Sequence, residues 1–190
     1  MLVKYIYIYI YIYMVLVSHK YKFIYIKNIK VAGSSVESFF GKYCIDPKKV
    51  YNYNDAISEH IDKFGIIGSR GDGMKNSDKW INHKNALSIR NDLGKEKFDE
   101  YLKFCVIRNP YDKMVSRYYY DKMVSRYYGR PSKLSFKEFV KTYHNNNLQI
   151  HSINGKIVCD YFIRYEYLEE DIKKLCKKLK IDSYDISLLP

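Results

Sequence analysis

A lysine and several small residues lie in a short loop between two segments of different periodicity. Residues 22–26 have the apolar and aromatic content of a buried strand, and an amphipathic helix is expected from Val36. The loop residues suited to contact an anion are Lys30, Ala32, Gly33, Ser34 and Ser35. Backbone N–H groups at a helix N-terminus, with an ammonium beside them, can bind a phosphate or a similar anion. This segment therefore predicts an anion site.

A second candidate anion site follows another apolar run. Residues 103–107 indicate a buried strand that presents Arg108 at its C-terminal end, and Ser116 follows in an expected helix. An arginine side chain supplies bidentate, charge-assisted hydrogen bonds to a phosphate, and a serine hydroxyl adds another. Two anion sites, each at the C-terminal end of a strand, suit a nucleotide that carries phosphates at both ends.

The order of residues in the first loop argues against the common ATP and GTP phosphate loop. That loop requires GxxxxGK[ST], with the lysine after the second glycine. Here Lys30 precedes Gly33, and neither Gly-Lys-Ser nor Gly-Lys-Thr occurs in the chain. An ordinary nucleotide hydrolase is disfavoured. A nucleotide kinase is a weaker alternative for the same reason, and because no carboxylate partner for Mg²⁺ is evident.

Taken together, these motifs resemble the carbohydrate-type sulfotransferases, whose pattern is roughly strand-PKTAGTS-helix and later strand-RNPxxRxxSxY. The likeness extends through residues 135–140 and 160–171 and covers most of residues 20–182. The family usually has proline where this chain has Ile29, and often arginine where it has Lys113. The ordered set of motifs is far more specific than either loop alone.

The resemblance implies a three-layer α/β/α domain with a mainly parallel sheet, similar to that of P-loop nucleotide-binding proteins. A length of 190 residues, 47% hydrophobic and 28% charged, fits one globular domain with one sizeable core. We expect residues 1–17 to be a low-complexity segment outside the domain and residues 18–190 to form it. The family normally continues past residues 188–190, so a shortened C-terminal part is also expected. The predicted strands lie near residues 22–26, 103–107 and 159–165.

The implied reaction moves a sulfuryl group from 3′-phosphoadenosine 5′-phosphosulfate to a hydroxyl, with a carbohydrate as the expected acceptor and without a metal. By resemblance, Lys30 stabilises charge on the departing phosphate, and the loop from Ala32 to Ser35 binds the 5′-phosphosulfate. Arg108 and Ser116 would bind the 3′-phosphate. An attacking hydroxyl must lose a proton, and His83 is the predicted general base. Gln149 resembles a family position near the acceptor.

The net charge of +12 and the pI near 9.3 permit a polyanionic partner. Abundant Lys, Tyr, Ile and Asn are also what AT-rich codons produce, so the charge alone decides little. A basic RNA-binding module is a further alternative, but the aromatic RNA-binding pattern is lacking and no nucleic acid is expected as a partner. The four cysteines are far apart and form no metal-binding spacing. A reducing, cytoplasmic location is expected, with the Golgi membrane as the alternative from animal family members.

Two low-complexity features complicate this interpretation. Residues 5–13 alternate Tyr and Ile, and the uncharged stretch 5–18 is short of the ~20 residues of a spanning helix. We interpret it as a translated TA-dinucleotide tract rather than a membrane anchor.

The second feature is a tandem duplication, in which residues 111–119 (YDKMVSRYY) are repeated at 120–128. Nine helical residues advance by ~900°, half a turn beyond two full turns, so the two copies face opposite sides of a continuous helix. Ser125 then cannot replace Ser116. Either the helix is ~13 Å longer or one copy bulges out. The duplication leaves a catalytically inactive homologue that binds nucleotide or glycan as the main alternative function.

Overall fold

A computed structural model describes residues 15–54, 58–69, 79–80, 84–129, 131–143 and 147–189. The predicted general base His83 and the whole Tyr-Ile stretch of residues 5–13 lie outside these residues, so the structure does not bear on them.

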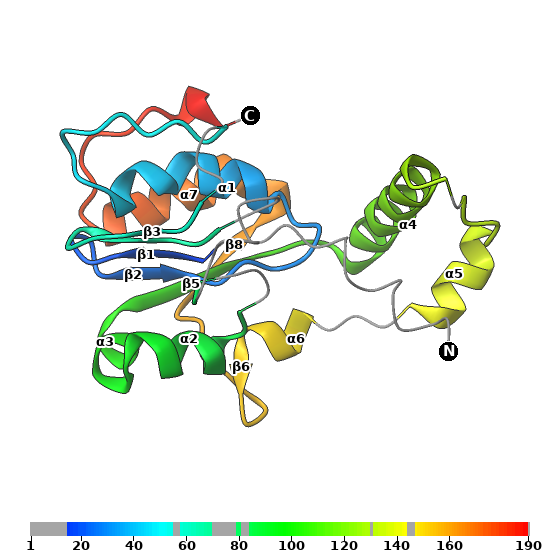
Figure 1. The fold of residues 1–190 in the computed structure, drawn as a ribbon, viewed down its shortest axis with the longest axis horizontal. Coiled ribbons are helices and arrows are strands. Elements are labelled where there is room, and N and C mark those ends of the chain that lie inside the picture. The colour runs from blue at the N-terminus through cyan, green and yellow to red at the C-terminus, as the bar shows by residue number, and fades with distance from the viewer. Residues whose placement is uncertain are drawn as a thin grey trace.

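The centre of the fold is a six-stranded mixed sheet with strand order β3-β4-β1-β2-β5-β8 (Figure 1). Its strands are β1 (Leu16–Ser18), β2 (Phe23–Tyr25), β3 (His60–Ile61), β4 (Gly65–Ile67), β5 (Leu102–Ile107) and β8 (Tyr161–Arg164). β2 pairs with β5 in parallel, and so does β5 with β8. The other three pairs are antiparallel, so β2, β4, β5 and β8 all point the same way. The mainly parallel sheet and its three predicted strands are confirmed.

Helices cover both faces of the sheet, which confirms the three-layer α/β/α architecture (Figure 1). On one face lie α1 (Gly33–Phe40) and α7 (Leu168–Lys178), and on the other lie α2 (Ala86–Leu93) and α3 (Lys95–Glu100). Alternation along β2 serves both layers, because successive side chains of a strand point to opposite faces. Phe23 and Tyr25 join the core beneath α1 and α7, whereas Ile24 and Ile26 join the core beneath α2 and α3.

The folded domain includes residues before position 18. Val15, Leu16 and Val17 are buried in the two cores, and β1 begins two residues before the expected boundary. β1 also forms an antiparallel hairpin with β2 that the sequence reading did not anticipate. Its turn has Lys22 in the left-handed region, with φ 50°.

Two helices lie away from the three layers (Figure 1). They are α4 (Pro110–Tyr127) and α5 (Phe136–Thr142). α4 runs without a break through the repeat, so the duplication lengthens the helix and no copy bulges out. Tyr118, from the first copy, packs against Phe136 and Phe139 of α5 with ring centroids 5.3 and 5.4 Å apart. Among the described residues, no helix has the length and apolar character needed to cross a membrane.

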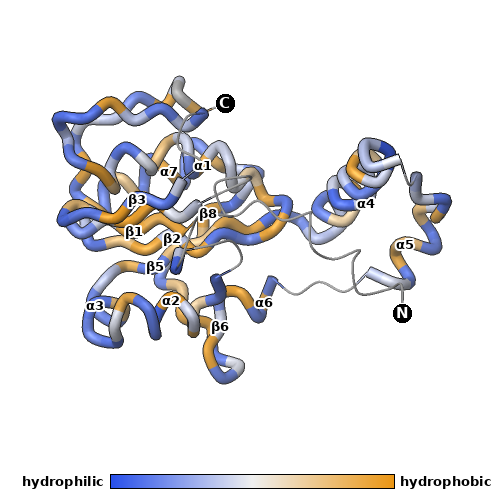
Figure 2. Tube along the Cα trace, viewed as in Figure 1, coloured by the Kyte–Doolittle hydropathy of each residue, from blue (hydrophilic) through white to orange (hydrophobic). Residues whose placement is uncertain are grey.

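The smaller elements complete the chain. They are η1 (Gly41–Cys44), α6 (Asn147–Ile150), the hairpin of β6 (Ser152–Ile153) and β7 (Lys156–Ile157), η3 (Tyr165–Tyr167) and η4 (Ile186–Leu188). Figure 2 shows hydrophobic residues concentrated in the central strands, with hydrophilic residues prominent on the outer helices.

Candidate anion-binding site

The loop after β2 has the backbone shape of an anion site. Lys30 and Ala32 both adopt left-handed conformations, with φ 58° and 60°, and α1 begins at Gly33. Ala32 is the N-cap of α1 and provides no side-chain cap. The partial positive charge of the helix N-terminus therefore faces the loop that carries Lys30. The predicted loop residues Lys30 and Ala32 to Ser35 are thus brought together at one end of α1.

A buried ion pair between Lys27 and Glu37 holds this loop against α1. Lys27 Nζ lies 2.5 Å from Glu37 Oε2, and the two side chains are 4% and 0% exposed. The stem of Lys27 passes so close to Gly33 that a Cβ there would lie 2.3 Å from Lys27 Cε. Any side chain at position 33 would therefore displace the buried Lys27 stem. The Glu37 carboxylate, on the first turns of α1, is thus bound to Lys27.

Arg108 extends from the end of β5 toward the same loop. Its Nη1 donates a long hydrogen bond of 3.5 Å to the Lys30 carbonyl, and its guanidinium stacks 4.0 Å from the centroid of Tyr165. Arg108 Nε is buried and has no hydrogen-bond acceptor among the residues described. A buried unpaired N–H is rare in proteins, and it gives Arg108 a donor available for a ligand. The two predicted anion sites meet because β2 and β5 are parallel neighbours.

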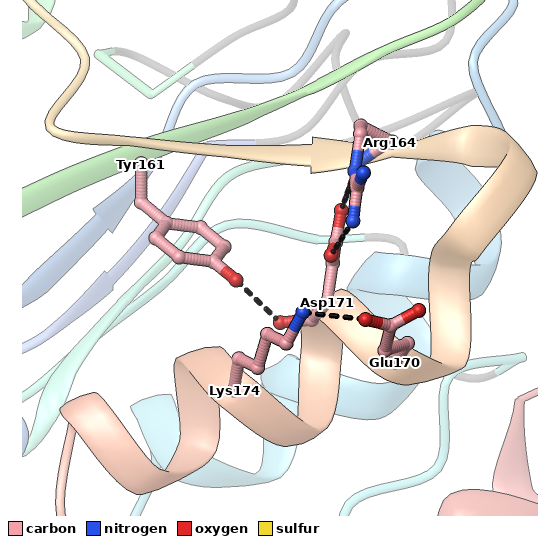
Figure 3. A network of polar contacts seen from close by, with 5 residues as sticks. All are labelled: Tyr161, Arg164, Glu170, Asp171 and Lys174. Carbon is pink, nitrogen blue, oxygen red and sulfur yellow. Dashed lines mark hydrogen bonds and ion pairs between the residues drawn. The ribbon is translucent and has the colours of Figure 1, made fainter.

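The segment that supports Arg108 is held by a polar network between β8 and α7 (Figure 3). Arg164 donates from Nε and Nη2 to the two carboxylate oxygens of Asp171, at 2.8 and 2.7 Å. These bonds to Arg164 lower the pKa of Asp171. The network fixes η3, where Tyr165 contacts Arg108 and Glu166 accepts a 2.7 Å hydrogen bond from the Asn109 backbone N–H. Glu166 and Asp171 therefore have a structural part in this segment.

Further cations lie on the buried side of α4, which is called its inner face below. Lys113 and Arg117 are only 4% and 5% exposed. Ser116 is half-buried and, by its helical spacing, lies on the same side. Burial, with Arg117 nearby, lowers the pKa of Lys113 to about 8. Burial also lowers the pKa of Lys30, and the positive charges of Arg117 and Arg108 lower it further. Mutual repulsion among these cations is what a bound polyanion would relieve.

The predicted acceptor contact Gln149 does not point into a buried site, and two of its neighbours in the chain make the contacts to the loop instead. Gln149 is exposed on α6, and it is Asn147 of the same segment whose Oδ1 accepts a 3.4 Å hydrogen bond from the Ile29 N–H. His151, which sequence reasoning missed, is buried with Nδ1 3.2 Å from Asn28 Oδ1. No helical or strand periodicity in the sequence indicates the contact of Asn147 with Ile29 or that of His151 with Asn28. His60 lies on edge strand β3, three strands from β2 and therefore away from this loop.

The repeat separates its two serines as the half-turn argument predicts. Ser125 Oγ accepts a 3.0 Å hydrogen bond from the backbone N–H of Ser132 and donates to the Lys122 carbonyl. It thus closes the turn after α4. The arrangement as a whole gathers cations and helix N–H groups at the C-terminal ends of β2 and β5, the edge at which ligands generally bind to such sheets. Within the described ranges, no group of three or more His, Cys, Asp or Glu side chains is placed to hold a metal ion.

Comparison with known proteins agrees with this geometry. No solved structure is significantly similar to the chain. An uncharacterized protein from Archaeoglobus fulgidus is 44% identical over 100 residues, which is 50% of this chain and 80% of that protein. Residues 13–184 match the model of the sulfotransferase family, a span that contains both anion-binding loops and the strands that carry them. The chain therefore belongs to the sulfotransferase family.

Proposed function

We propose that the protein transfers a sulfuryl group from 3′-phosphoadenosine 5′-phosphosulfate to a hydroxyl of a carbohydrate. The observation that carries this proposal is the meeting of the Lys30 loop with Arg108 at the ends of adjacent parallel strands. One loop suits the phosphosulfate and the other suits a second phosphate on the same nucleotide. A nucleoside monophosphate would engage only one of them.

The transfer needs stabilisation of the departing phosphate. As the acceptor oxygen bonds to sulfur, the bond between sulfur and the bridging oxygen breaks, and that oxygen gains negative charge. The Lys30 ammonium and the N-terminus of α1 would stabilise this charge, and partial removal from water strengthens the interaction. Gly33, Ser34 and Ser35 would hold the phosphosulfate in line.

The 3′-phosphate is assigned to the other side of the site. Arg108 has an unpaired Nε and a long, replaceable contact to the Lys30 carbonyl. Ser116 and Lys113 on α4 complete this group. His83 stays our proposal for the general base that takes the acceptor's proton, and Gln149 our proposal for an acceptor contact. No metal is needed, because the loop and its cations balance the charge.

The first experiment is a binding comparison by calorimetry. Adenosine 3′,5′-bisphosphate should bind at least about tenfold more tightly than AMP, a difference of ~1.4 kcal/mol. Equal affinities would remove the assignment of Arg108 and Ser116. Binding of ATP that requires Mg²⁺ would favour a nucleotide kinase instead.

The second experiment measures sulfate transfer from labelled donor to a panel of glycans. Lys30→Ala should lower turnover by roughly 100-fold, as does loss of one preorganised electrostatic group, while the desulfated product keeps most of its affinity. Lys20→Ala is the matched control, because Lys20 is exposed in the β1–β2 turn at the opposite end of β2. Similar losses in both variants would contradict the role of Lys30.

A second candidate function is nucleotide binding without transfer. The observation that favours it is the entry of Tyr120, from the second copy of the repeat, into the site, where its ring centroid lies 4.1 Å from Lys30 Nζ. Tight binding of the bisphosphate with no transfer to any glycan would support this candidate and exclude the enzyme.

A further inference from the structure

The second copy of the repeat places two of its residues at the anion site. Arg117, in the first copy, is on the buried side of α4. Tyr120 and Asp121 come three and four residues after it and so lie on the same side of the helix. Asp121 occupies the repeat position that Asp112 occupies in the first copy. Asp112 is exposed, whereas Asp121 is half-buried against Arg117. The half-turn offset has therefore turned one aspartate outward and the other inward.

Asp121 lies among the cations that would bind the ligand. Its Oδ2 accepts a 3.0 Å hydrogen bond from Arg117 Nε. Its Oδ1 is 2.9 Å from the same nitrogen but is buried without a hydrogen bond in the described part of the chain. The Asp121 charge also raises the pKa of Lys30, against the lowering by burial, Arg117 and Arg108. The Asp121 carboxylate thus offsets the positive charge of Arg117 on α4 and that of Lys30 in the loop after β2.

A chain with one copy of the repeat would have a different residue at this place. Removing residues 120–128 joins Tyr119 directly to Gly129 and puts the sequence Gly-Arg where Tyr120 and Asp121 now stand. The duplication has therefore placed a carboxylate four residues after Arg117, inside α4, where the shorter chain would have the glycine and arginine that follow the end of the helix.

We propose that Asp121 is an internal competitor for the anion-binding site, whose carboxylate must give up Arg117 before a phosphate can bind there. This inference rests on the proposed function in naming the nucleotide as the displaced competitor. A carboxylate and a phosphate oxygen compete for the same guanidinium donors, because both accept charge-assisted hydrogen bonds. Tyr120, stacked on the Lys30 ammonium, adds to the barrier on the other side of the site.

The test compares Asp121→Asn with Asp112→Asn, which makes the same change at the other copy of the repeat. Calorimetry with adenosine 3′,5′-bisphosphate should show at least about threefold tighter binding for Asp121→Asn, the scale of one partly screened charge. Asp112→Asn should bind as the parent chain does. Deletion of residues 120–128, with folding checked by circular dichroism, should also tighten binding. Equal or weaker binding by Asp121→Asn would overturn the proposal.

A ligand-free measurement separates this inference from the proposed function. Lysine amines carrying ¹³C-methyl groups can be titrated by NMR, with the Lys30 signal assigned by its loss in Lys30→Arg. Asp121→Asn should lower the pKa of Lys30, and Asp112→Asn should leave it unchanged. If no variant binds the bisphosphate, the proposed function fails. Asp121 as the internal counter-ion is then upheld by a lowered pKa and overturned by an unchanged one.

Discussion

Helices α1 and α4 follow parallel neighbouring strands, yet different forces hold them in place. α1 buries Val36, Phe39 and Phe40 completely in the core beneath it. α4 is more than twice as long, and its buried residues are Lys113 and Arg117. α1 is fixed to the sheet by apolar packing, whereas the residues that α4 buries are cationic.

The difference assigns the two helices different tasks. A rigid α1 keeps the loop geometry around Gly33 constant. α4 is held by the Asn109 side-chain cap, which accepts the Tyr111 N–H, and by the contact of Tyr118 with α5. Because cationic groups replace apolar ones on its inner face, a bound anion would add to the interactions that position α4.

The largest expected effect concerns the apolar anchor of α1. Phe40→Ala should lower the free energy of unfolding by about 3–5 kcal/mol, the range for removing a buried aromatic side chain. Tyr127→Ala, at a residue 82% exposed near the end of α4, should change it by no more than about 0.5 kcal/mol. Urea unfolding of both variants measures the contrast. Equal destabilisation would mean that α4 is packed as firmly as α1.

The packing beneath the first loop gives the next largest effect. Gly33→Ala should destabilise the protein by about 1–3 kcal/mol, because the new methyl group would collide with the buried Lys27 stem and disturb its pair with Glu37. The control, Ser38→Ala on the same helix, should remain within about 0.5 kcal/mol. Thermal unfolding is sufficient for the comparison. A neutral Gly33→Ala would show that Lys27 can move aside freely.

The duplicated serines test α4 at two points with identical chemistry. Ser116→Ala should weaken bisphosphate binding by ~1–2 kcal/mol, as expected for a lost hydrogen bond to a charged group. Ser125→Ala should leave binding unchanged and lower stability by about 0.5–1.5 kcal/mol, because the Ser132 N–H loses its acceptor. Calorimetry and urea unfolding together separate the two. Weaker binding by Ser125→Ala, with unchanged binding by Ser116→Ala, would mean that the second copy of the repeat binds the nucleotide.

The smallest effect is a pH dependence from Lys113. Its pKa is about 8 because it is buried, with Arg117 facing it on α4 and His151 packed nearby. A phosphate favours the protonated amine, so binding should weaken as pH rises through about 8, by at most about tenfold per pH unit for one linked proton. Lys113→Arg should flatten this slope, since arginine stays charged. An unchanged slope would assign the titration to another group, such as Lys30.

The linkage for stability has the opposite sign. Below pH 8 both folded and unfolded chains hold the Lys113 proton, and burial of the charge destabilises the fold. Between pH 8 and the ordinary lysine pKa, the folded chain loses the proton first. Stability from this group alone therefore rises over that interval.

Sequence reasoning reached the parts of the site that depend on local patterns. The run before Lys30, the Ala-Gly-Ser-Ser segment and Arg108 after an apolar strand each define their own conformation. The parallel strands β2, β5 and β8 followed from the same apolar runs. The meeting of Lys30 with Arg108 followed from placing both at strand ends.

The remainder depended on contacts that have no local signature. The β1–β2 turn lacks the Asn-Gly or Gly-containing signal of a tight hairpin and instead bends at Lys22, so the antiparallel half of the sheet was missed. Lys27 and Glu37 are ten residues apart and meet only because the loop folds back. The inward orientation of Asp121 required knowing that α4 continues without interruption.

The polar attachment of α4 also explains where this fold can accept new sequence. A nine-residue insertion into α1 would rotate the residues beyond it by half a turn, and Phe39 or Phe40 would leave the core. The same insertion in α4 displaced no apolar side chain from the sheet, because the helix extends past the three layers. α4 is thus a site of structural tolerance, where a copying error can survive as a longer helix and expose new residues to selection.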